Sequence, residues 1–209
     1  MRAFFAVDLP ESLAEPLAAV QTDLDDAAGV RVTDPTQAHV TLKFLGDIDA
    51  GDGDGRSDGD GDGRSDGDGD EPTDIPAVDD VIAAGERAVD RAGVAPFDCS
   101  IAGLGVFPAI DYISVVWAGV EEGSEELTAL HETLEAETTP LGVDPDDHAF
   151  TPHVTLARMD DARGKDVVQR LVRERDPEFG RFEATEIRLV ESALTSDGSE
   201  YETVASFEL

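Results

Sequence analysis

Cysteine is nearly absent from this chain of 209 residues, in which Cys99 is the one residue of its kind. An internal disulfide is therefore excluded, and nothing in the sequence points to an oxidising compartment. No basic residue lies near Cys99 in the sequence, which favours a buried strand residue over a reactive thiolate. Hydrophobic runs of membrane-spanning length are also missing, and Asp8 and Pro10 interrupt the apolar start of the chain. These absences predict a soluble, cytoplasmic protein without a membrane anchor.

Positive charge is also scarce. The chain has 15 lysines and arginines against 48 acidic residues, its net charge is −33, and its two lysines are Lys43 and Lys165. Protein molecules with such a surface repel one another and any polyanion, unless molar salt shortens the Debye length to about 3 Å. We therefore expect a halophilic protein of the kind found in salt-loving archaea. If its ligand is a nucleic acid, we expect it to contact an end rather than the backbone, which Lys and Arg normally bind.

One segment has almost no hydrophobic residue. Residues 49–71 consist of Asp-Gly repeats with two copies of Asp-Gly-Arg-Ser-Asp-Gly-Asp-Gly, and their removal leaves a net charge of −25 on the rest of the chain. Because the segment has no apolar side chain beyond Ala50 to bury, we expect a disordered acidic insertion. Calcium binding is the alternative, but the spacing fits neither an EF-hand loop nor the nonapeptide repeats of β-helices.

The remaining sequence alternates helical and strand patterns. Apolar periodicity predicts strands and helices in the order given at the end of this paragraph, without a linker that would divide the chain. We therefore expect one α+β domain over residues 1–209, built from two pseudo-symmetric lobes. Each lobe is expected to be an antiparallel sheet with helices on its outer face, and the two enclose a cleft. Strands are expected at 2–8, 38–45, 97–104, 112–120, 182–194 and 201–207, and helices at 10–28, 76–92, 121–141 and 165–175, with Ser124 as an N-cap.

The tetrapeptide His-Val-Thr-Leu occurs twice, at residues 39–42 and 153–156, in a chain with four histidines. In a strand, the His and Thr of each copy point from one face while Val and Leu enter the core. A single copy has an ordinary explanation in β-propensity and a lone histidine. Two copies, 114 positions apart, indicate a duplicated half-site. Its chemistry would be phosphoryl transfer, with two imidazoles as acid and base and two hydroxyls donating to phosphate oxygens.

These motifs, with the sequence that flanks them, carry a family resemblance. The two H-x-T-x motifs resemble those of the 2H phosphoesterase superfamily. The start of the chain (residues 1–10) and the segments 39–46, 103–108, 151–158 and 190–194 are similar to the RNA 2′,3′-cyclic phosphodiesterase family, also called the 2′-5′ RNA ligase family. The resemblance runs nearly end to end apart from the insertion. It implies the bilobed 2H fold.

The resemblance also implies roles for the motif residues. It makes His39 the proton donor to the leaving 3′ oxygen and His153 the proton acceptor that activates water, with Thr41 and Thr155 binding the phosphate. Two further residues are candidate phosphate contacts. Lys43 continues the His39 face by strand parity, whereas Arg158 has the opposite parity to His153 and reaches the cleft only if the strand ends or bulges. By the same parity, Phe44 is expected to pack in the core, and His131 is expected on a helix surface.

The function so implied is hydrolysis of a 2′,3′-cyclic phosphate at an RNA end to a 2′-phosphate, without metal or cofactor, and its reversal as 2′-5′ ligation. The expected partner is such an RNA end, for example on a tRNA fragment, and we expect a monomer. No P-loop or lysine-nucleotidylation motif is evident, which argues against an ATP-dependent ligase. Two alternatives stay open: a 2H enzyme acting on a small cyclic phosphate or on oligoadenylate, and a non-catalytic RNA-end-binding module.

Overall fold

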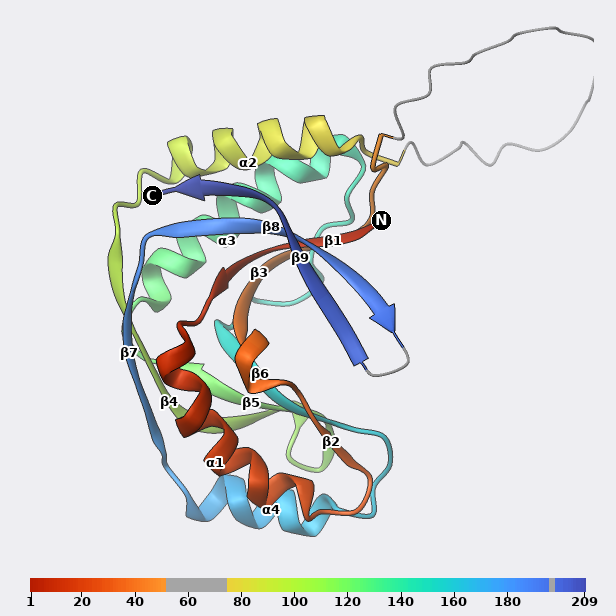
Figure 1. Cartoon of the computed structure of the whole chain (residues 1–209), viewed down its shortest axis with the longest axis vertical. Coiled ribbons are helices and arrows are strands. Elements are labelled where there is room, and N and C mark those ends of the chain that lie inside the picture. The colour runs from red at the N-terminus through yellow and green to blue at the C-terminus, as the bar shows by residue number, and fades with distance from the viewer. Residues whose placement is uncertain (52–74, 196–197) are drawn as a thin grey trace, which may run out of the picture.

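The computed structural model describes residues 1–51, 75–195 and 198–209 (Figure 1). Strands in the described residues form one antiparallel sheet in the order β7-β4-β5-β6-β3-β1-β8-β9, with β2 paired to β6. Their bounds are β1 Arg2–Asp8, β2 Val30–Val32, β3 His39–Asp47, β4 Phe97–Ala109, β5 Tyr112–Val120, β6 His153–Met159, β7 Glu178–Ala184, β8 Glu186–Thr195 and β9 Gly198–Glu208.

The sheet has two halves, and helices cover each on its outer side. Helices α2 (Val78–Ala92) and α3 (Ser124–Thr138) pack together over β3 and β9, at the top of Figure 1. Helices α1 (Ala14–Asp25) and α4 (Lys165–Glu174) lie at the other end, where α1 contacts β2, β6 and β7 and α4 contacts β4. The expected α+β class, with antiparallel strands and helices outside, is confirmed. The halves meet through β3 and β6.

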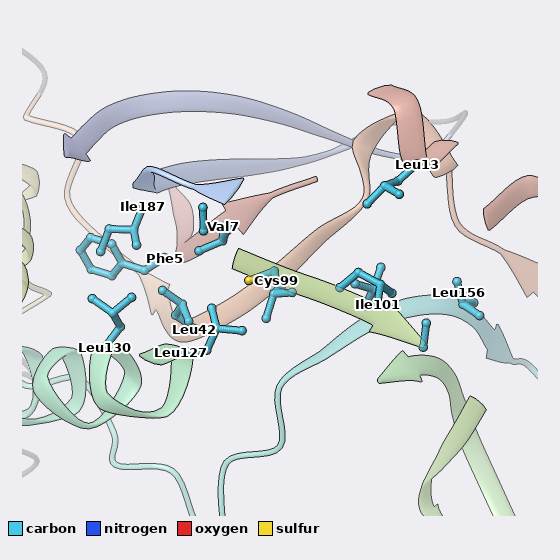
Figure 2. Packing of buried hydrophobic residues seen from close by; sticks show 14 of the residues in the cluster. Phe5, Val7, Leu13, Leu42, Cys99, Ile101, Leu127, Leu130, Leu156 and Ile187 are labelled. Carbon is cyan, nitrogen blue, oxygen red and sulfur yellow. The ribbon is translucent and has the colours of Figure 1, made fainter. Parts of the chain in front are cut away.

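The core lies between the sheet and these helices. Phe5 of β1 is fully buried, and Figure 2 shows it beside Leu130 of α3 and Ile187 of β8. Each such side chain contributes about 1.5–3 kcal/mol when it is fully buried. Cys99 is 1% exposed in β4, and burial, followed by nearby carboxylates, raises the pKa of its thiol to about 12. This confirms Cys99 as a buried strand residue.

Three expected boundaries are wrong. The strand expected at 182–194 is two strands separated by Thr185, because the chain crosses there from β7, paired to β4, to β8, paired to β1. Strand β4 continues to Ala109, so Phe107 lies in a strand and pairs with Val115. The N-cap of α3 is Gly123, whose left-handed backbone turns the chain into the helix, while the Ser124 hydroxyl donates to the Val120 carbonyl.

Two predictions concern parts of the chain outside the sheet. Of the acidic insertion, residues 49–51 are described and Asp49 forms a bridge with Ala77; the expectation of disorder falls on residues 52–71, which lie outside the described residues. Within the described part of the chain, no helix combines the length and apolarity needed to cross a bilayer.

Candidate active site

Both His-Val-Thr-Leu motifs lie on strands, and these strands pair with each other. Strands β3 and β6 are antiparallel, with Val40 opposite Val154. A step of one residue to either side of this pair sets His39 opposite Thr155, and Thr41 opposite His153. The local twofold axis of the two motifs therefore passes between the valines. Sheet formation brings together the four side chains that the duplicated motif predicts.

The two imidazoles are held in the same way. Nδ1 of His39 lies 2.9 Å from the Gln37 carbonyl oxygen, and Nδ1 of His153 lies 2.7 Å from the Thr151 carbonyl oxygen. Because a carbonyl only accepts, each Nδ1 is the protonated nitrogen that donates. Each Nε2 is then free of this bond and available for proton transfer. The arrangement fixes both tautomers by the same local contact, made two residues before each histidine.

Burial lowers the pKa of both imidazoles, because the charged form loses hydration. The hydrogen bond to Gln37 and then the Asp8 carboxylate act in the opposite direction on the pKa of His39. Arg158 lowers the pKa of both rings, and His39 lowers that of His153. The charge of Arg158 thus acts on both histidines, as expected for a cation at the same cleft.

A β-bulge follows the threonine of each motif. Leu42 is skipped in the pairing of β3 with β1, and Leu156 is skipped in the pairing of β6 with β5. Each bulge inserts one residue and so reverses the alternation of faces beyond it. The fifth residue after each histidine then lies on the histidine face. That residue is Phe44 in β3, which is 62% exposed, and Arg158 in β6, which is also exposed.

These bulges decide three predictions that depended on parity. Phe44 was expected in the core and lies instead on the cleft face, where it is 6.0 Å from the ring of Phe4. Arg158 meets the condition set for it, a bulged strand. Lys43 was expected beside His39, but it pairs with the core residue Phe5 and is 1% exposed. Lys43 therefore does not lie on the phosphate face.

A pocket of about 850 Å³ adjoins the threonine of the first motif and the histidine of the second. Its wall contains Thr41 and His153, one from each motif, together with the aromatic side chains of Phe44 and Phe107. The segment 143–151 supplies further lining residues, including three aspartates. This pocket is large enough for a nucleoside and presents an exposed aromatic ring beside the two motifs.

Comparison with known proteins agrees with this geometry. The family model described as "2'-5' RNA ligase superfamily" matches residues 9–195. The chain belongs to this superfamily. An RNA 2′,3′-cyclic phosphodiesterase of Methanothermobacter thermautotrophicus is 33% identical over 211 residues, covering 100% of this chain and 99% of the relative. One of Archaeoglobus fulgidus is 30% identical over the full length of both chains.

Two solved structures share the fold of this chain. TT0787 of Thermus thermophilus superposes with a TM-score of 0.73 at 28% identity, covering 100% of this chain and 98% of that chain. E. coli LigT, in its complex with NADP+, gives a TM-score of 0.68 at 20% identity, covering 100% and 96%. The second likeness is one of fold. The resemblance seen in the sequence is thus confirmed across the chain.

Lys43 binds two residues of the pocket lining, Asp144 and Asp146. Its ammonium lies 2.5 Å from Oε2 of Glu135, 3.0 Å from Oδ1 of Asp146 and 2.9 Å from the Asp144 carbonyl oxygen. His131, Glu135 and Asp146 have the donor atoms and proximity of a metal site. The lysine ammonium already forms ion pairs with both carboxylates and lies between them, so we assign no metal to this cluster. We call these four side chains the Lys43 cluster.

His131 was expected on the helix surface, and this is wrong. It is 7% exposed, its Nδ1 lies 2.8 Å from the Leu42 carbonyl oxygen, and its ring stacks on Phe150 at 4.2 Å. Helix α3 thus contacts both the bulge of β3 and the segment that leads to His153. Sequence periodicity had placed His131 beside buried leucines without showing this carbonyl partner.

Aromatic side chains support both catalytic candidates. Phe4 stacks on His39 at 5.0 Å and Tyr201 contacts the same ring edge-on at 5.1 Å. Phe107 packs edge-on against His153 at 4.9 Å. These contacts bury the rings and keep them oriented. Phe4 and Tyr201 come from β1 and β9, far from either motif in the chain, so no local sequence pattern connects them with the histidines.

Proposed function

We propose that this protein hydrolyses RNA 2′,3′-cyclic phosphate ends to 2′-phosphomonoesters by two-histidine acid and base catalysis, without a metal. The observation that carries the proposal is the symmetric pair of imidazoles on the paired strands β3 and β6, each with Nδ1 committed to a carbonyl and Nε2 free of that bond. The names of the similar archaeal proteins support the substrate class.

In the proposed reaction, the oxygen of water attacks phosphorus as the bond from phosphorus to the 3′ oxygen breaks. Nε2 of neutral His153 accepts the proton of the water, and Nε2 of protonated His39 gives a proton to the leaving 3′ oxygen. Thr41 and Thr155 donate to the non-bridging oxygens, and Arg158 balances their negative charge. Within the described residues, neither threonine hydroxyl donates to a protein group, so both are available. A 5′-hydroxyl that attacks phosphorus in place of water, with the same bond to the 3′ oxygen broken and the same two proton transfers, would give a 2′-5′ linkage.

The pocket favours recognition of a terminal nucleotide. Phe44 offers an exposed ring on which a base can stack, an interaction worth about 1–3 kcal/mol per base. The aspartates at 144, 146 and 147 in the pocket lining repel a long phosphate backbone. This favours an RNA end, in accord with the charge of the chain. The same observation favours a small nucleoside cyclic phosphate as a second candidate substrate.

The test is to replace each histidine separately with alanine, in molar KCl. We expect each variant to lose about 10²–10⁴-fold in kcat on an oligonucleotide with a 2′,3′-cyclic phosphate end. Circular dichroism should show the fold of the parent, and ³¹P NMR should identify a 2′-monophosphate as the product of the parent enzyme. Retained turnover in both variants would reject the enzymatic proposal. Binding of the RNA end without any turnover by the parent would favour a non-catalytic module.

A further inference from the structure

A second arginine lies beside Arg158 on the cleft face. In the pairing of β2 with β6, Arg31 is directly opposite Arg158. Arg31 is exposed, whereas Val30 and Val32 on either side of it pack against the core. Its side chain therefore leaves the sheet on the face opposite the core, the face of Arg158. Residues directly opposed in an antiparallel pair have Cβ atoms about 4.5–5.5 Å apart.

This pairing is unfavourable unless an anion is present. Like charges directly opposite each other on a sheet destabilise it. Within the described part of the chain, Arg31 has one carboxylate partner, Asp160, with Nη2 to Oδ1 at 3.4 Å, and both side chains are more than half exposed. Such a surface pair contributes about 0–1 kcal/mol. Among the described residues, no carboxylate forms an ion pair with Arg158. Two arginine side chains thus leave the same face from directly opposed positions, in a chain of net charge −33.

The two arginines lie at different distances from the reacting centre. Arg158 is on the strand of His153, and its charge acts on both imidazoles. Arg31 is on the next strand, β2, beside the far end of β6 from His153. A phosphate bound between the imidazoles is therefore within the influence of Arg158, whereas Arg31 lies one strand further away, where the chain of an extended ligand would continue.

We propose that Arg31 binds the internucleotide phosphodiester that precedes the cyclic phosphate, and so selects an RNA end over a free nucleoside cyclic phosphate. This inference rests on the proposed function. A guanidinium suits a phosphodiester because its planar N–H groups donate two parallel hydrogen bonds to the two non-bridging oxygens. The Asp160 carboxylate competes with the phosphodiester for the N–H groups of Arg31. Arg31 is thus a specificity-determining residue and is not required for the bond-breaking step.

The test compares two substrates that differ by one nucleotide, and so by one phosphodiester and one nucleoside: cytidine 2′,3′-cyclic phosphate, and the dinucleotide CpC with a 2′,3′-cyclic phosphate end. In molar KCl, we expect Arg31→Gln to lower kcat/KM for the dinucleotide about tenfold, mainly through KM. The value for the mononucleotide should not change. Arg31→Lys should restore part of the loss, because it keeps the charge without the planar geometry. Asp160→Asn should lower KM for the dinucleotide alone.

The matched control is Arg181→Gln, which removes another exposed arginine in a surface ion pair with Glu122. In this variant, kcat/KM for both substrates should equal that of the parent. A dinucleotide with an uncharged methylphosphonate linkage should be cleaved equally by the parent and by Arg31→Gln. Equal loss on both substrates, or no loss on either, would overturn the assignment of Arg31. Failure of the parent enzyme to turn over either substrate would reject the proposed function, and this inference with it.

Discussion

The Lys43 cluster gives a stability prediction whose order of effects follows from exposure. The side chain of Lys43 is 0% exposed, whereas those of Glu135 and Asp146 are 25% and 41% exposed. Removing both carboxylates, as in Glu135→Gln with Asp146→Asn, leaves a buried ammonium with amide oxygens and the Asp144 carbonyl. Breaking a buried ion pair from one side costs about 3–5 kcal/mol. Because the amide oxygens still accept hydrogen bonds, we expect the lower end, about 3 kcal/mol.

Removing the cation instead should cost less. Lys43→Met replaces a buried charge with an apolar side chain of similar length, and water can rehydrate the two partly exposed carboxylates. We expect about 1–2 kcal/mol. For a chain of this size, each kcal/mol lowers Tm by about 2–4 °C. The double variant should therefore melt about 6–12 °C below the parent, and Lys43→Met about 2–8 °C below it.

The assay is urea unfolding in molar KCl, followed by circular dichroism. High salt screens exposed charges but affects buried pairs much less, so the cost in the Lys43 cluster should persist. As a control, Glu122→Gln removes one partner of the exposed pair with Arg181 and should cost less than about 1 kcal/mol. If Lys43→Met costs as much as the double variant or more, burial of the ammonium does not set the energetics and the reasoning is refuted.

Three further predictions concern the site. Because the pKa of both imidazoles is lowered, the kcat/KM optimum should lie on the acid side of their ordinary value of 6.5. Arg158→Gln removes one cause of this lowering, so both limbs of the pH profile should move to higher pH. Limbs that do not move would contradict this prediction. Phe44→Ala should raise KM for cytidine 2′,3′-cyclic phosphate about 5–100-fold with little change in Tm, since the ring is 62% exposed; an unchanged KM would exclude stacking. Gly105→Ala should cost about 1–3 kcal/mol in urea unfolding and lower kcat, because its Cβ would overlap the Trp117 ring that packs on His153; stability and kcat equal to the parent would show that the ring moves freely.

Local pattern was sufficient for much of the fold. The apolar stripe of the first helix predicted the buried face of α1, including Leu17 and Leu24, because a helix packing on a sheet must bury one face. The strands around the motifs were found for the same reason. What the pattern did not show is which half of the sheet each helix covers: α1 follows β1 in the chain but packs on β2 and β6 of the other half.

The division within the site is equally clear. The repeated tetrapeptide determined which side chains share a face, because strand periodicity is a local property of the backbone. The bulges at Leu42 and Leu156 arise from pairing with neighbouring strands, and only that pairing fixes where an extra residue is inserted. Tertiary structure therefore decided that Phe44 and Arg158 lie on the histidine face of their strands and that Lys43 does not. The sequence by itself determined the four motif residues and the low content of lysine and arginine. The pairing of β3 and β6 with their neighbouring strands decided which other side chains surround the four motif residues.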